Sequence, residues 1–354
     1  MPTKILFTVL NWGLGHASRS IPIIKHLITA KIELIIASDG DALLLLQKEF
    51  PHQIFETLPA YNIKYSKNAK DFDKTIFLQL SRLGKIIQEE NLVCKKLIVK
   101  HNITHIISDN RYGCYQKNIP SAIICHQLTL QHKNFLSKKI MNEVHFKLLN
   151  KFDEIWIPDY KENNLAGEIS KTKNKKLLQK IKHIGALSRL KNEHLEKKYD
   201  FAIILSGPEP QRTILENTLY QQTISLNKKT AFVRGVSSKE NHLESTKKVK
   251  IFSLLESTQL NKILNQTEIV ICRAGYSSIM DLVILNKKAI IIPTLGQTEQ
   301  EYLARHLKSK NIFLSIKQEK IYLKQDLPTL QKLVATKEKN RETSFKNTIE
   351  TFCL

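Results

Sequence analysis

The sequence predicts an α/β protein of two Rossmann-like domains, each built on a parallel sheet. Short runs of β-branched apolar residues alternate with longer amphipathic stretches along the whole chain, which is typical of βαβ units. The alternation falls into two series, and a length of 354 residues suits two domains. In such sheets, ligands bind beyond the carboxyl ends of the strands.

The first series predicts strands wherever a short β-branched run stands between polar turns. These strands cover Lys4–Leu10, Glu33–Ala37, Gln53–Glu56, Thr104–Ser108, Ser121–Cys125 and Glu154–Ile157. Apolar residues at helical spacing predict the helices between them, which cover Ala17–Ala30, Asp73–His101 and Leu136–Asn150.

The second series repeats the pattern. Its strands are predicted at Phe201–Leu205, Thr230–Val233, Val249–Phe252, Glu268–Cys272, Ala289–Ile292 and Asn311–Leu314. Its helices are predicted at Arg212–Leu226, Tyr276–Leu285 and Glu299–Ser309.

Four segments follow from this pattern. We expect an N-terminal Rossmann-like domain over residues 1–165 and a polar, lysine-rich surface segment that crosses between domains over residues 166–199. A C-terminal Rossmann-like domain should cover residues 200–330. The last residues, 331–354, are predicted to form a helix that packs back toward the N-terminal domain.

Composition excludes several classes of protein. With 42% hydrophobic and 25% charged residues, the chain is neither disordered nor collagen-like. No apolar run approaches the roughly 18 residues of a membrane span, and the start lacks the pattern of a signal peptide. The cysteines are odd in number and scattered, which favours reduced thiols over disulfides or a zinc site. We therefore expect a cytoplasmic protein.

The net charge of +22 has two explanations that the sequence leaves open. Lys greatly outnumbers Arg, and Ile and Asn are also abundant, so drift in base composition would account for much of it. An anionic partner would also account for it: nucleic acid, a nucleotide-type ligand or an acidic membrane surface.

The first predicted strand is followed by a glycine-rich turn that opens a helix. The two glycines Gly13 and Gly15 permit close backbone approach, and the helix start offers free N–H groups to a ligand. Ser18 stands where a dinucleotide fingerprint needs glycine, and a P-loop ending is also absent. His16 at this helix start is either a candidate general base or an ordinary helix-capping residue.

Similar turns open helices in the second half. Ser206, Gly207 and the helix start after them could bind a phosphate, with Arg212 adding a charged contact. The run from Cys272 to Asp281 places Gly275 and two serines after a strand, and Asp281 could hydrogen-bond a ribose. Carboxylate and amide groups then crowd the turn from Pro293 to Tyr302, and such groups suit sugar hydroxyls.

Taken together, these motifs resemble a two-domain glycosyltransferase of the GT-B fold, with two Rossmann-like domains that face each other across a cleft. The second-half pattern Cys-Arg-x-Gly, Ser, acidic residue, strand, Pro and then Glu/Gln-Gln is similar to the family 28 group, which includes the N-acetylglucosaminyltransferase that forms lipid II. Gly-x-Gly-His-x-x-Arg and Ser-Gly-Pro-Glu-Pro-Gln-Arg also resemble uncharacterised bacterial glycosyltransferase-like proteins. The similarity covers Lys4–His126 weakly and Ser206–Leu307 more strongly.

The resemblance implies roles for particular residues. On the nucleotide-sugar side it points to Ser206, Gly207, Gln211, Arg212, Arg273, Gly275, Ser277, Ser278, Asp281, Glu299 and Gln300. On the acceptor side it points to Gly13, Gly15, Arg19, Asn110, Arg111 and His126. His16 is the first candidate for the catalytic base and Asp109 the second. His126 is the third, since Gln127 replaces the acidic residue of the family's His-Glu-Gln loop.

The expected activity is inverting, metal-independent transfer of a hexose or N-acetylhexosamine from a UDP-type nucleotide sugar to an acceptor hydroxyl. The nucleotide sugar is a co-substrate, so no cofactor is expected, and no Asp-x-Asp motif or metal-ligand cluster is present. The acceptor would be a saccharide or a lipid-linked sugar in the synthesis of cell-envelope polysaccharide or glycolipid. The basic amphipathic stretch His132–Lys151 would fit peripheral binding to an anionic membrane, or simply a domain helix with a solvated lysine face.

Three other functions remain open at this stage. A nucleotide-sugar 2-epimerase shares the two-domain architecture but would release free sugar without an acceptor. A nucleic-acid-binding protein is disfavoured as a class, because the lysines are spread along the chain and no recognition motif is present. The third is an inactive binding protein of the same fold.

Overall fold

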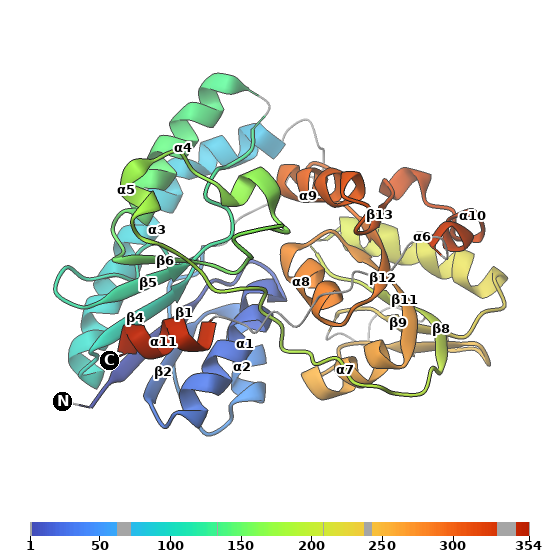
Figure 1. Ribbon diagram of the computed structural model, residues 1–354, viewed down its shortest axis with the longest axis horizontal. Helices are drawn as coiled ribbons and strands as arrows, with labels where there is room; N and C mark the ends of the chain where they lie inside the picture. The colour runs from blue at the N-terminus through green and yellow to red at the C-terminus, as the bar shows by residue number, and fades with distance from the viewer. Residues whose placement is uncertain are drawn as a thin grey trace. The chain divides into compact units, whose positions relative to one another are not determined.

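The computed structural model describes residues 2–61, 72–132, 134–207, 209–236, 243–330 and 345–353. They form two compact units (Figure 1). The first unit holds the described residues up to 187 together with the C-terminal helix, and the second unit holds those from 188 to 330.

A parallel sheet lies at the centre of the first unit. Its described strands run in the order β3-β2-β1-β4-β5-β6-β7, so the strand order reverses between β1 and β4, where open sheets of this kind bind ligands. The strands are β1 (Lys4–Val9), β2 (Glu33–Ser38), β3 (Ile54–Thr57), β4 (His105–Asp109), β5 (Ser121–Ile124), β6 (Glu154–Ile157) and β7 (Ile181–His183).

Helices cover this sheet. They are α1 (Leu14–Thr29), α2 (Gly40–Glu49), α3 (Phe72–His101), α4 (Phe135–Leu149), the short α5 (Lys175–Leu178), a 3-10 turn at Gly167–Ser170, and α11 (Phe345–Cys353). The last of these belongs to the first unit: the ring of Phe352 lies 5.3 Å from that of Trp156 and 5.5 Å from that of His105.

The second unit repeats the architecture. Its sheet is also parallel, in the order β10-β9-β8-β11-β12-β13 among the described strands, and it reverses between β8 and β11. The strands are β8 (Tyr199–Ile204), β9 (Thr230–Val233), β10 (Val249–Phe252), β11 (Thr267–Arg273), β12 (Lys288–Ile292) and β13 (Leu314–Ser315). The helices are α6 (Gln211–Ser225), α7 (Ser257–Asn265), α8 (Tyr276–Ile284), α9 (Thr298–Ser309) and α10 (Leu323–Leu330), with a 3-10 turn at Gln318–Lys320.

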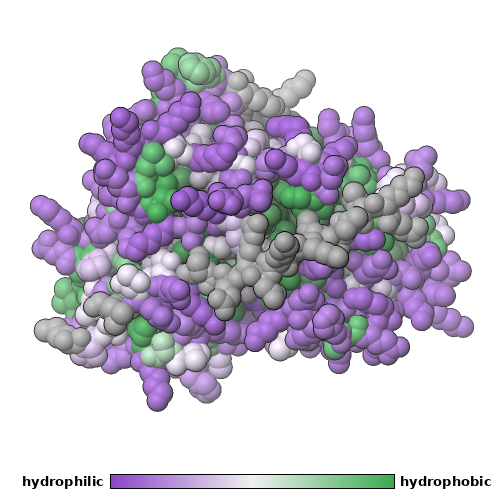
Figure 2. Space-filling view, in the orientation of Figure 1, coloured by the Kyte–Doolittle hydropathy of each residue, from purple (hydrophilic) through white to green (hydrophobic). Residues whose placement is uncertain are grey.

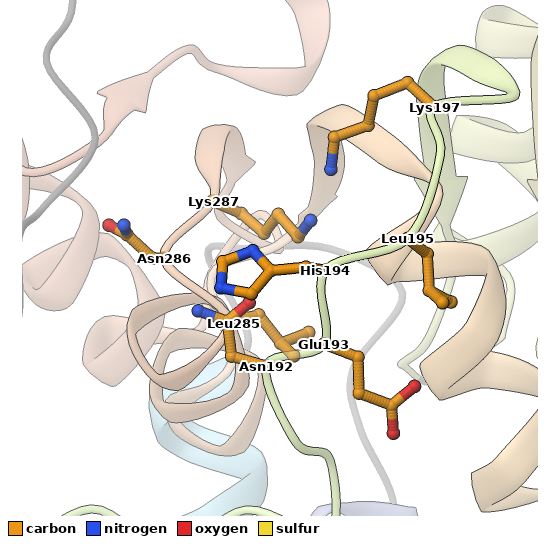
Figure 3. A pocket seen from close by; sticks show the side chains of 8 residues that line it. All are labelled: Asn192, Glu193, His194, Leu195, Lys197, Leu285, Asn286 and Lys287. Atoms are coloured by element: carbon orange, nitrogen blue, oxygen red, sulfur yellow. The ribbon is translucent and has the colours of Figure 1, made fainter.

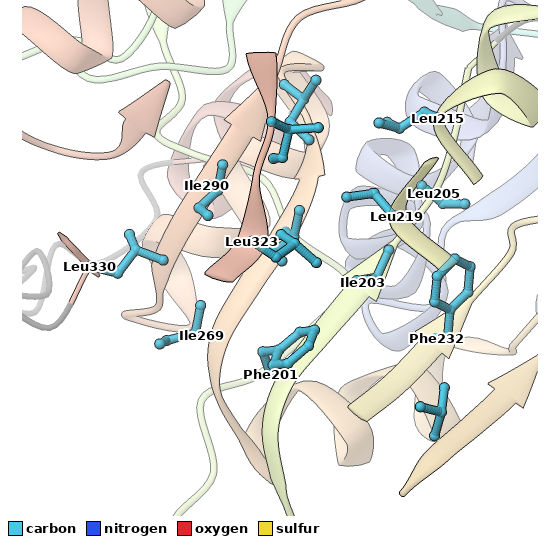
Figure 4. Close-up of a cluster of buried hydrophobic side chains, with 14 residues drawn as sticks. Phe201, Ile203, Leu205, Leu215, Leu219, Phe232, Ile269, Ile290, Leu323 and Leu330 are labelled. Atoms are coloured by element: carbon cyan, nitrogen blue, oxygen red, sulfur yellow. The ribbon is translucent and has the colours of Figure 1, made fainter. Parts of the chain in front are cut away.

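Buried strand residues form the core of the second unit (Figure 4). Phe201 and Ile203 of β8 pack in one cluster with Phe232 of β9 and Ile290 of β12. A parallel sheet covered on both faces buries almost every strand position, which explains why these segments are nearly continuous apolar runs.

The two series of strands and helices are confirmed, with most ends shifted by a residue or two and the start of α1 shifted by three, but several details differ. Strand β7 and the fully buried Leu177 lie within residues 166–199, so this segment is not only a surface crossing. Helices α2 and α7 were not predicted, and the strand predicted at Asn311–Leu314 is the short β13. Of the expected C-terminal helix, residues 345–353 form α11, whereas residues 331–344 and Leu354 lie outside the described residues.

Candidate functional site

Three polar residues stand at the carboxyl ends of adjacent strands in the first unit. His16 lies in the first turn of α1 after β1, Asp109 ends β4, and His126 follows β5. Because β1, β4 and β5 are neighbours in a parallel sheet, their ends meet at one edge. The three candidate bases are therefore brought together.

The glycine turn before α1 sets the entry of this helix. Gly13 has φ +72°, a conformation that glycine adopts readily and other residues adopt rarely. The space around a side chain at position 13 would be open, so the backbone angle and not crowding requires glycine. Gly15 follows in the first turn of α1, one residue before His16.

Asp109 is the centre of a buried polar network. Its carboxylate accepts hydrogen bonds from Arg19 Nε at 2.7 Å, from Arg19 Nη2 and from Ser20 Oγ at 3.0 Å. His16 Nδ1 lies 2.7 Å from Oδ1 of the same carboxylate. Burial opposes ionisation of Asp109, but the charge of Arg19 and the contact with His16 outweigh it and hold its pKa well below the usual range. Asp109 is thus ionised at neutral pH and is a poor base.

The ionised carboxylate fixes the tautomer of His16. A carboxylate only accepts hydrogen bonds, so Nδ1 carries the hydrogen and the lone pair lies on Nε2. Burial, followed by the charge of Arg19, lowers the pKa of His16 despite the opposing effect of Asp109. The side chain keeps 13% of its surface exposed, and Nε2 has no hydrogen-bond partner among the described residues. Neutral His16 can therefore accept a proton at Nε2.

Arg19 connects the network to the third histidine. Its Nη1 lies 3.0 Å from Nδ1 of His126, and since arginine only donates, this nitrogen of His126 is the acceptor. Arg19 is 2% exposed. It orients Asp109 and His126 inside the fold, which does not fit the contact with an acceptor molecule that the resemblance implied.

Arg111 also differs from its expected role, because it is completely buried. Its guanidinium donates to Glu90 Oε1 at 3.0 Å, to the backbone oxygen of Val9 at 3.0 Å and to Asp39. Tyr61 donates to the other oxygen of Glu90 at 2.9 Å. Arg111 therefore joins β1, α3 and the turn after β2, and it has no surface to offer to an acceptor. The sequence alone did not indicate that Glu90 and Asp39 are the partners of Arg111.

Asn110, the neighbour of Arg111, has a backbone φ of +57°. Its Oδ1 is buried and has no hydrogen-bond partner in the described structure. The structure thus leaves one polar atom of this residue unsatisfied near the end of β4.

In the second unit, the turns after β8 and β12 lie close together. Gly207 has φ +108°, which favours glycine, and a Cβ at this position would lie 3.9 Å from Thr294 Oγ1. That hydroxyl is buried and unpartnered within the described residues. Ser206 and Gly207 were predicted for this site, whereas Thr294 was not.

The most informative group of the second unit is Arg273, the last residue of β11. It is 1% exposed, and its Nη2 donates to the backbone oxygen of Gln211, the first residue of α6, at 2.6 Å. Its Nε and Nη1 are buried with no hydrogen-bond partner in the described structure. Burial lowers the pKa of Arg273 to about 10, so it stays charged at neutral pH. A buried, unsatisfied guanidinium is a strong candidate for binding an anion.

Arg212, in contrast, is already paired. It donates to Glu216 at 3.0 Å and to Glu209 at 2.6 Å, and Glu216 also accepts from Arg234. At 5% exposure, Arg212 holds α6 to the end of β9. Its expected contact with a diphosphate does not fit this arrangement, and Arg273 is better placed for it.

The helix after Arg273 carries the predicted ribose-binding carboxylate. Asp281 on α8 accepts a hydrogen bond from Ser188, which sequence reasoning did not single out. Burial raises the pKa of Asp281 to about 6, against the effects of Ser188 and Arg189. Gly275 precedes this helix, and its missing Cβ would lie 4.0 Å from Ser278 Oγ; Ser277 is in the first turn.

The predicted sugar contacts stand at the start of α9. Gln300 accepts a hydrogen bond from the backbone N–H of Thr294 at 2.9 Å and donates to Gln297, so it closes the turn after β12. Glu299 lies beside it in the first turn of the helix. Gln300 thus shapes the turn that contains Thr294.

The described residues contain neither a cluster of metal ligands nor a membrane-spanning helix. No group of three or more His, Cys, Asp or Glu side chains there is arranged to hold a metal ion. No helix in that part of the chain combines the length and apolar character needed to cross a membrane.

Comparison with known proteins adds two family matches. Residues 3–132 match the model of glycosyl transferase family 1, and residues 212–352 match that of the glycosyltransferase family 28 C-terminal domain. An uncharacterised glycosyltransferase of Methanosarcina mazei is 24% identical over 319 residues, which are 84% of this chain and 81% of the relative.

Solved structures show the same fold. The spinosyn rhamnosyltransferase SpnG, solved with thymidine diphosphate, has a TM-score of 0.61 at 11% identity over 99% of this chain and 95% of its own. MurG of Acinetobacter baumannii has a TM-score of 0.58 at 11% identity over 98% and 94% of the two chains. The two parallel sheets with their helices therefore form the GT-B fold.

Proposed function

This chain is a glycosyltransferase of the GT-B type, and we propose that it moves a sugar from a nucleoside diphosphate donor to an acceptor hydroxyl with inversion at the anomeric carbon. His16 would act as the base, and the second unit would hold the donor. The observation that carries this proposal is the buried pair of Asp109 and His16, in which an ionised carboxylate leaves Nε2 as the basic atom.

The chemistry follows from this pair. Nε2 of His16 takes the proton of the acceptor hydroxyl as its oxygen attacks the anomeric carbon. The bond from that carbon to the diphosphate oxygen breaks, and the nucleoside diphosphate leaves with the electron pair. The product carries the inverted glycosidic bond, and the proton on His16 passes to solvent. General bases of this kind accelerate reactions by about 10²- to 10⁴-fold.

The leaving diphosphate needs positive charge and hydrogen-bond donors. Arg273 has two unsatisfied guanidinium nitrogens beside the N-terminus of α6, and Gly207 and Thr294 line the neighbouring turns. Such donors stabilise an anion in a site shielded from water. We therefore propose that Arg273 supplies the charge for the diphosphate and that the reaction proceeds without a metal ion.

We further propose a UDP-type donor with a hexose or N-acetylhexosamine. Asp281 would bind the ribose, and Glu299 and Gln300 would bind the sugar. Binding of thymidine diphosphate by the structurally similar SpnG makes a pyrimidine nucleotide a reasonable first choice.

A lipid-linked acceptor is supported by the surface of α4. Four apolar side chains of this helix are strongly exposed: Phe135 at 82%, Leu136 at 65%, and Ile140 and Val144 at 47% each. Leu136, Ile140 and Val144 are spaced four apart and form a stripe, and Lys138, Lys139 and Lys147 accompany them. Lys133, also expected here, lies outside the described residues. Figure 2 shows hydrophobic atoms at the top of the view, over the outer end of α4 in Figure 1.

Such a surface fits the interface of an anionic membrane. Apolar side chains enter the acyl boundary, and lysines remain with the lipid headgroups. We propose that α4 brings the first unit to a membrane where a lipid-linked acceptor resides.

The experiment that tests the donor is a calorimetric panel of nucleoside diphosphates, followed by product analysis with the preferred UDP-sugar. We expect UDP to bind and to be released together with a new glycoside when saccharide and lipid-linked acceptors are supplied. Release of free sugar in the absence of any acceptor would point to an epimerase. A lack of binding by every nucleotide would contradict the proposal.

A further inference from the structure

A polar hollow lies in the second unit, at the edge of its sheet opposite the turns after β8 and β12. It has a volume of about 400 Å³ (Figure 3). Its walls come from the segment before β8, which contributes His194 and Lys197, and from the turn between α8 and β12, which contributes Asn286 and Lys287. Since Lys287 immediately precedes β12, this hollow stands at the amino ends of the strands. Strands of this length separate the two edges by on the order of 20 Å.

Two lysine ammonium groups meet in this hollow. Lys287 Nζ donates to the backbone oxygen of Thr267 at 2.9 Å, and Lys197 Nζ donates to the same oxygen at 3.3 Å and to that of Asn265 at 2.7 Å. Figure 3 shows the two amine ends directed toward each other, with the ring of His194 beside Lys287. An ammonium has three hydrogens, so Lys287 keeps two donors for a ligand.

The carboxylates around the two lysines do not neutralise them. Glu193 is turned away in Figure 3, and its Oε1 accepts from Asn261 at 2.9 Å. Glu268 lies 4.0 Å from Lys288. Neither Lys197 nor Lys287 forms a salt bridge among the described residues. Lys287 is 5% exposed, and burial together with the charge of Lys197 lowers its pKa to about 7.

We propose that this hollow is a second ligand site, in which Lys197 and Lys287 together bind a tetrahedral dianion: inorganic phosphate or the phosphate group of a small metabolite. An anion between the two ammonium groups would relieve their repulsion and use their remaining N–H donors. His194 and Asn286 would contact the same ligand from the rim. The volume falls within the range of small-molecule sites, so there is room for an ester as well as a free ion.

The site makes a specific prediction about protonation. The titratable groups around Lys287 are Lys197, Glu268 and, on the wall of the hollow, His194 and Glu193; the charge of Lys197 lowers the pKa of Lys287, and that of Glu268 opposes this effect. A bound dianion favours the charged ammonium, so binding must raise the pKa of Lys287. By the same linkage, anion affinity falls as the pH rises above about 7, by up to about tenfold for each pH unit.

The test is a titration of the full chain followed by NMR of ¹³Cε-labelled lysine, in sodium sulfate and in sodium chloride at equal ionic strength. Sulfate is the first probe because its charge is constant between pH 5 and 9. The Lys287 signal is assigned from its loss in Lys287→Gln. We expect sulfate to raise the pKa of Lys287 by one unit or more. Identical titrations in the two salts would overturn the proposal.

Two variants at neighbouring lysines test the site even if Lys287→Gln fails to fold. Lys197→Gln should weaken sulfate binding at least tenfold and remove most of the pKa change at Lys287. Lys198→Gln, an exposed neighbour, should leave both within twofold. Equal binding by the Lys197 and Lys198 variants would place the anion elsewhere and contradict the site. Titrations with inorganic phosphate and with glucose 6-phosphate at one pH distinguish the free ion from a phosphorylated metabolite as the ligand. Tighter binding of glucose 6-phosphate indicates a metabolite, and tighter binding of inorganic phosphate indicates the free ion.

Discussion

His16 Nδ1 lies 2.7 Å from Asp109 Oδ1, and this contact joins the helix after β1 to the end of β4. The contact determines how the two members of this pair differ as proton acceptors. Asp109 stays ionised because Arg19 and His16 stabilise its charge, and the proton-accepting atom becomes Nε2 of His16.

Replacing Asp109 by Asn should abolish most turnover while the donor still binds. The amide has nearly the same shape but no charge, so it neither fixes the His16 tautomer nor stabilises the imidazolium. We expect kcat to fall by about 10²- to 10⁴-fold. Ser20→Ala removes one hydrogen bond to the same carboxylate and should change kcat less than about tenfold. Equal effects of the two substitutions would contradict the assigned role of Asp109.

The pH dependence of kcat/KM should have an acid limb set by His16. Its pKa is lowered, so the neutral base persists to a lower pH than for a free histidine, and activity declines only below about 6.5. The same shift affects stability: because protonation of His16 is disfavoured in the folded state, its contribution to the free energy of unfolding is present above the unfolded pKa and is lost as the pH falls through the lower, folded-state pKa. Measurement of kcat/KM from pH 5 to 9 checks the limb, and a midpoint above 7 would exclude His16 as its source.

Arg273→Met should weaken the binding of nucleoside diphosphates without lowering the stability of the free enzyme. Removing a buried, unsatisfied charge leaves the free enzyme equally stable or more stable, while nucleoside diphosphate binding weakens about 10- to 100-fold. Thermal unfolding with and without UDP measures both. Arg305→Met, an exposed position on α9, is the control and should change neither quantity. A large loss of stability in the free Arg273 variant would mean that Arg273 has a structural role instead.

Arg111→Met, unlike Arg273→Met, should lower the stability of the free enzyme. It leaves the buried carboxylates of Asp39 and Glu90 without their cation, so the free energy of unfolding should drop by about 3–5 kcal/mol. Burial already raises the pKa of Glu90, so the loss of stability should become smaller as the pH falls and the carboxylate of Glu90 takes up a proton. Urea unfolding provides the measurement, with the exposed Arg82→Met as the control. Unchanged stability would show that the network is unimportant.

The exposed face of α4 predicts membrane binding that depends on both charge and apolar contact. At physiological salt the protein should float with anionic vesicles but not with phosphatidylcholine alone. The double variant Phe135→Ser, Ile140→Ser should lose at least about fivefold in bound fraction. Leu178→Ser changes an exposed leucine on α5, and this variant should bind normally. Flotation that is unaffected by the double variant would remove α4 as the contact.

Much of the fold could be predicted because the central strands of each sheet are buried on both faces. The run at β8 and the run at β11 are apolar enough to stand out from their polar surroundings, and glycine-containing turns mark their ends. Strand β7 was missed because it lies at the sheet edge with a half-exposed Ile181-Lys182-His183 sequence. Its hydrogen bonds to β6, and not its composition, make it a strand.

The candidate site was predictable in position but not in the pairing of its charges. The strand ends place His16, Asp109 and Arg273 at carboxyl edges, as the turn motifs indicated. Whether an arginine faces a ligand or a buried carboxylate depends on residues distant in sequence. Arg111 pairs with Asp39 and Glu90, and nothing near position 111 indicates this. Thr294 and Ser188 were missed for the same reason.

The role of His16 as the base is tested most sharply by the turnover of His16→Ala, measured beside its affinity for UDP. With a UDP-sugar and a competent acceptor, we expect kcat to fall by about 10²- to 10⁴-fold. Calorimetric affinity for UDP should stay within about twofold, since His16 lies in the first unit and the donor residues lie in the second. Turnover within a few-fold of the unmodified protein would contradict His16 as the base, and so would a product that retains the donor's anomeric configuration.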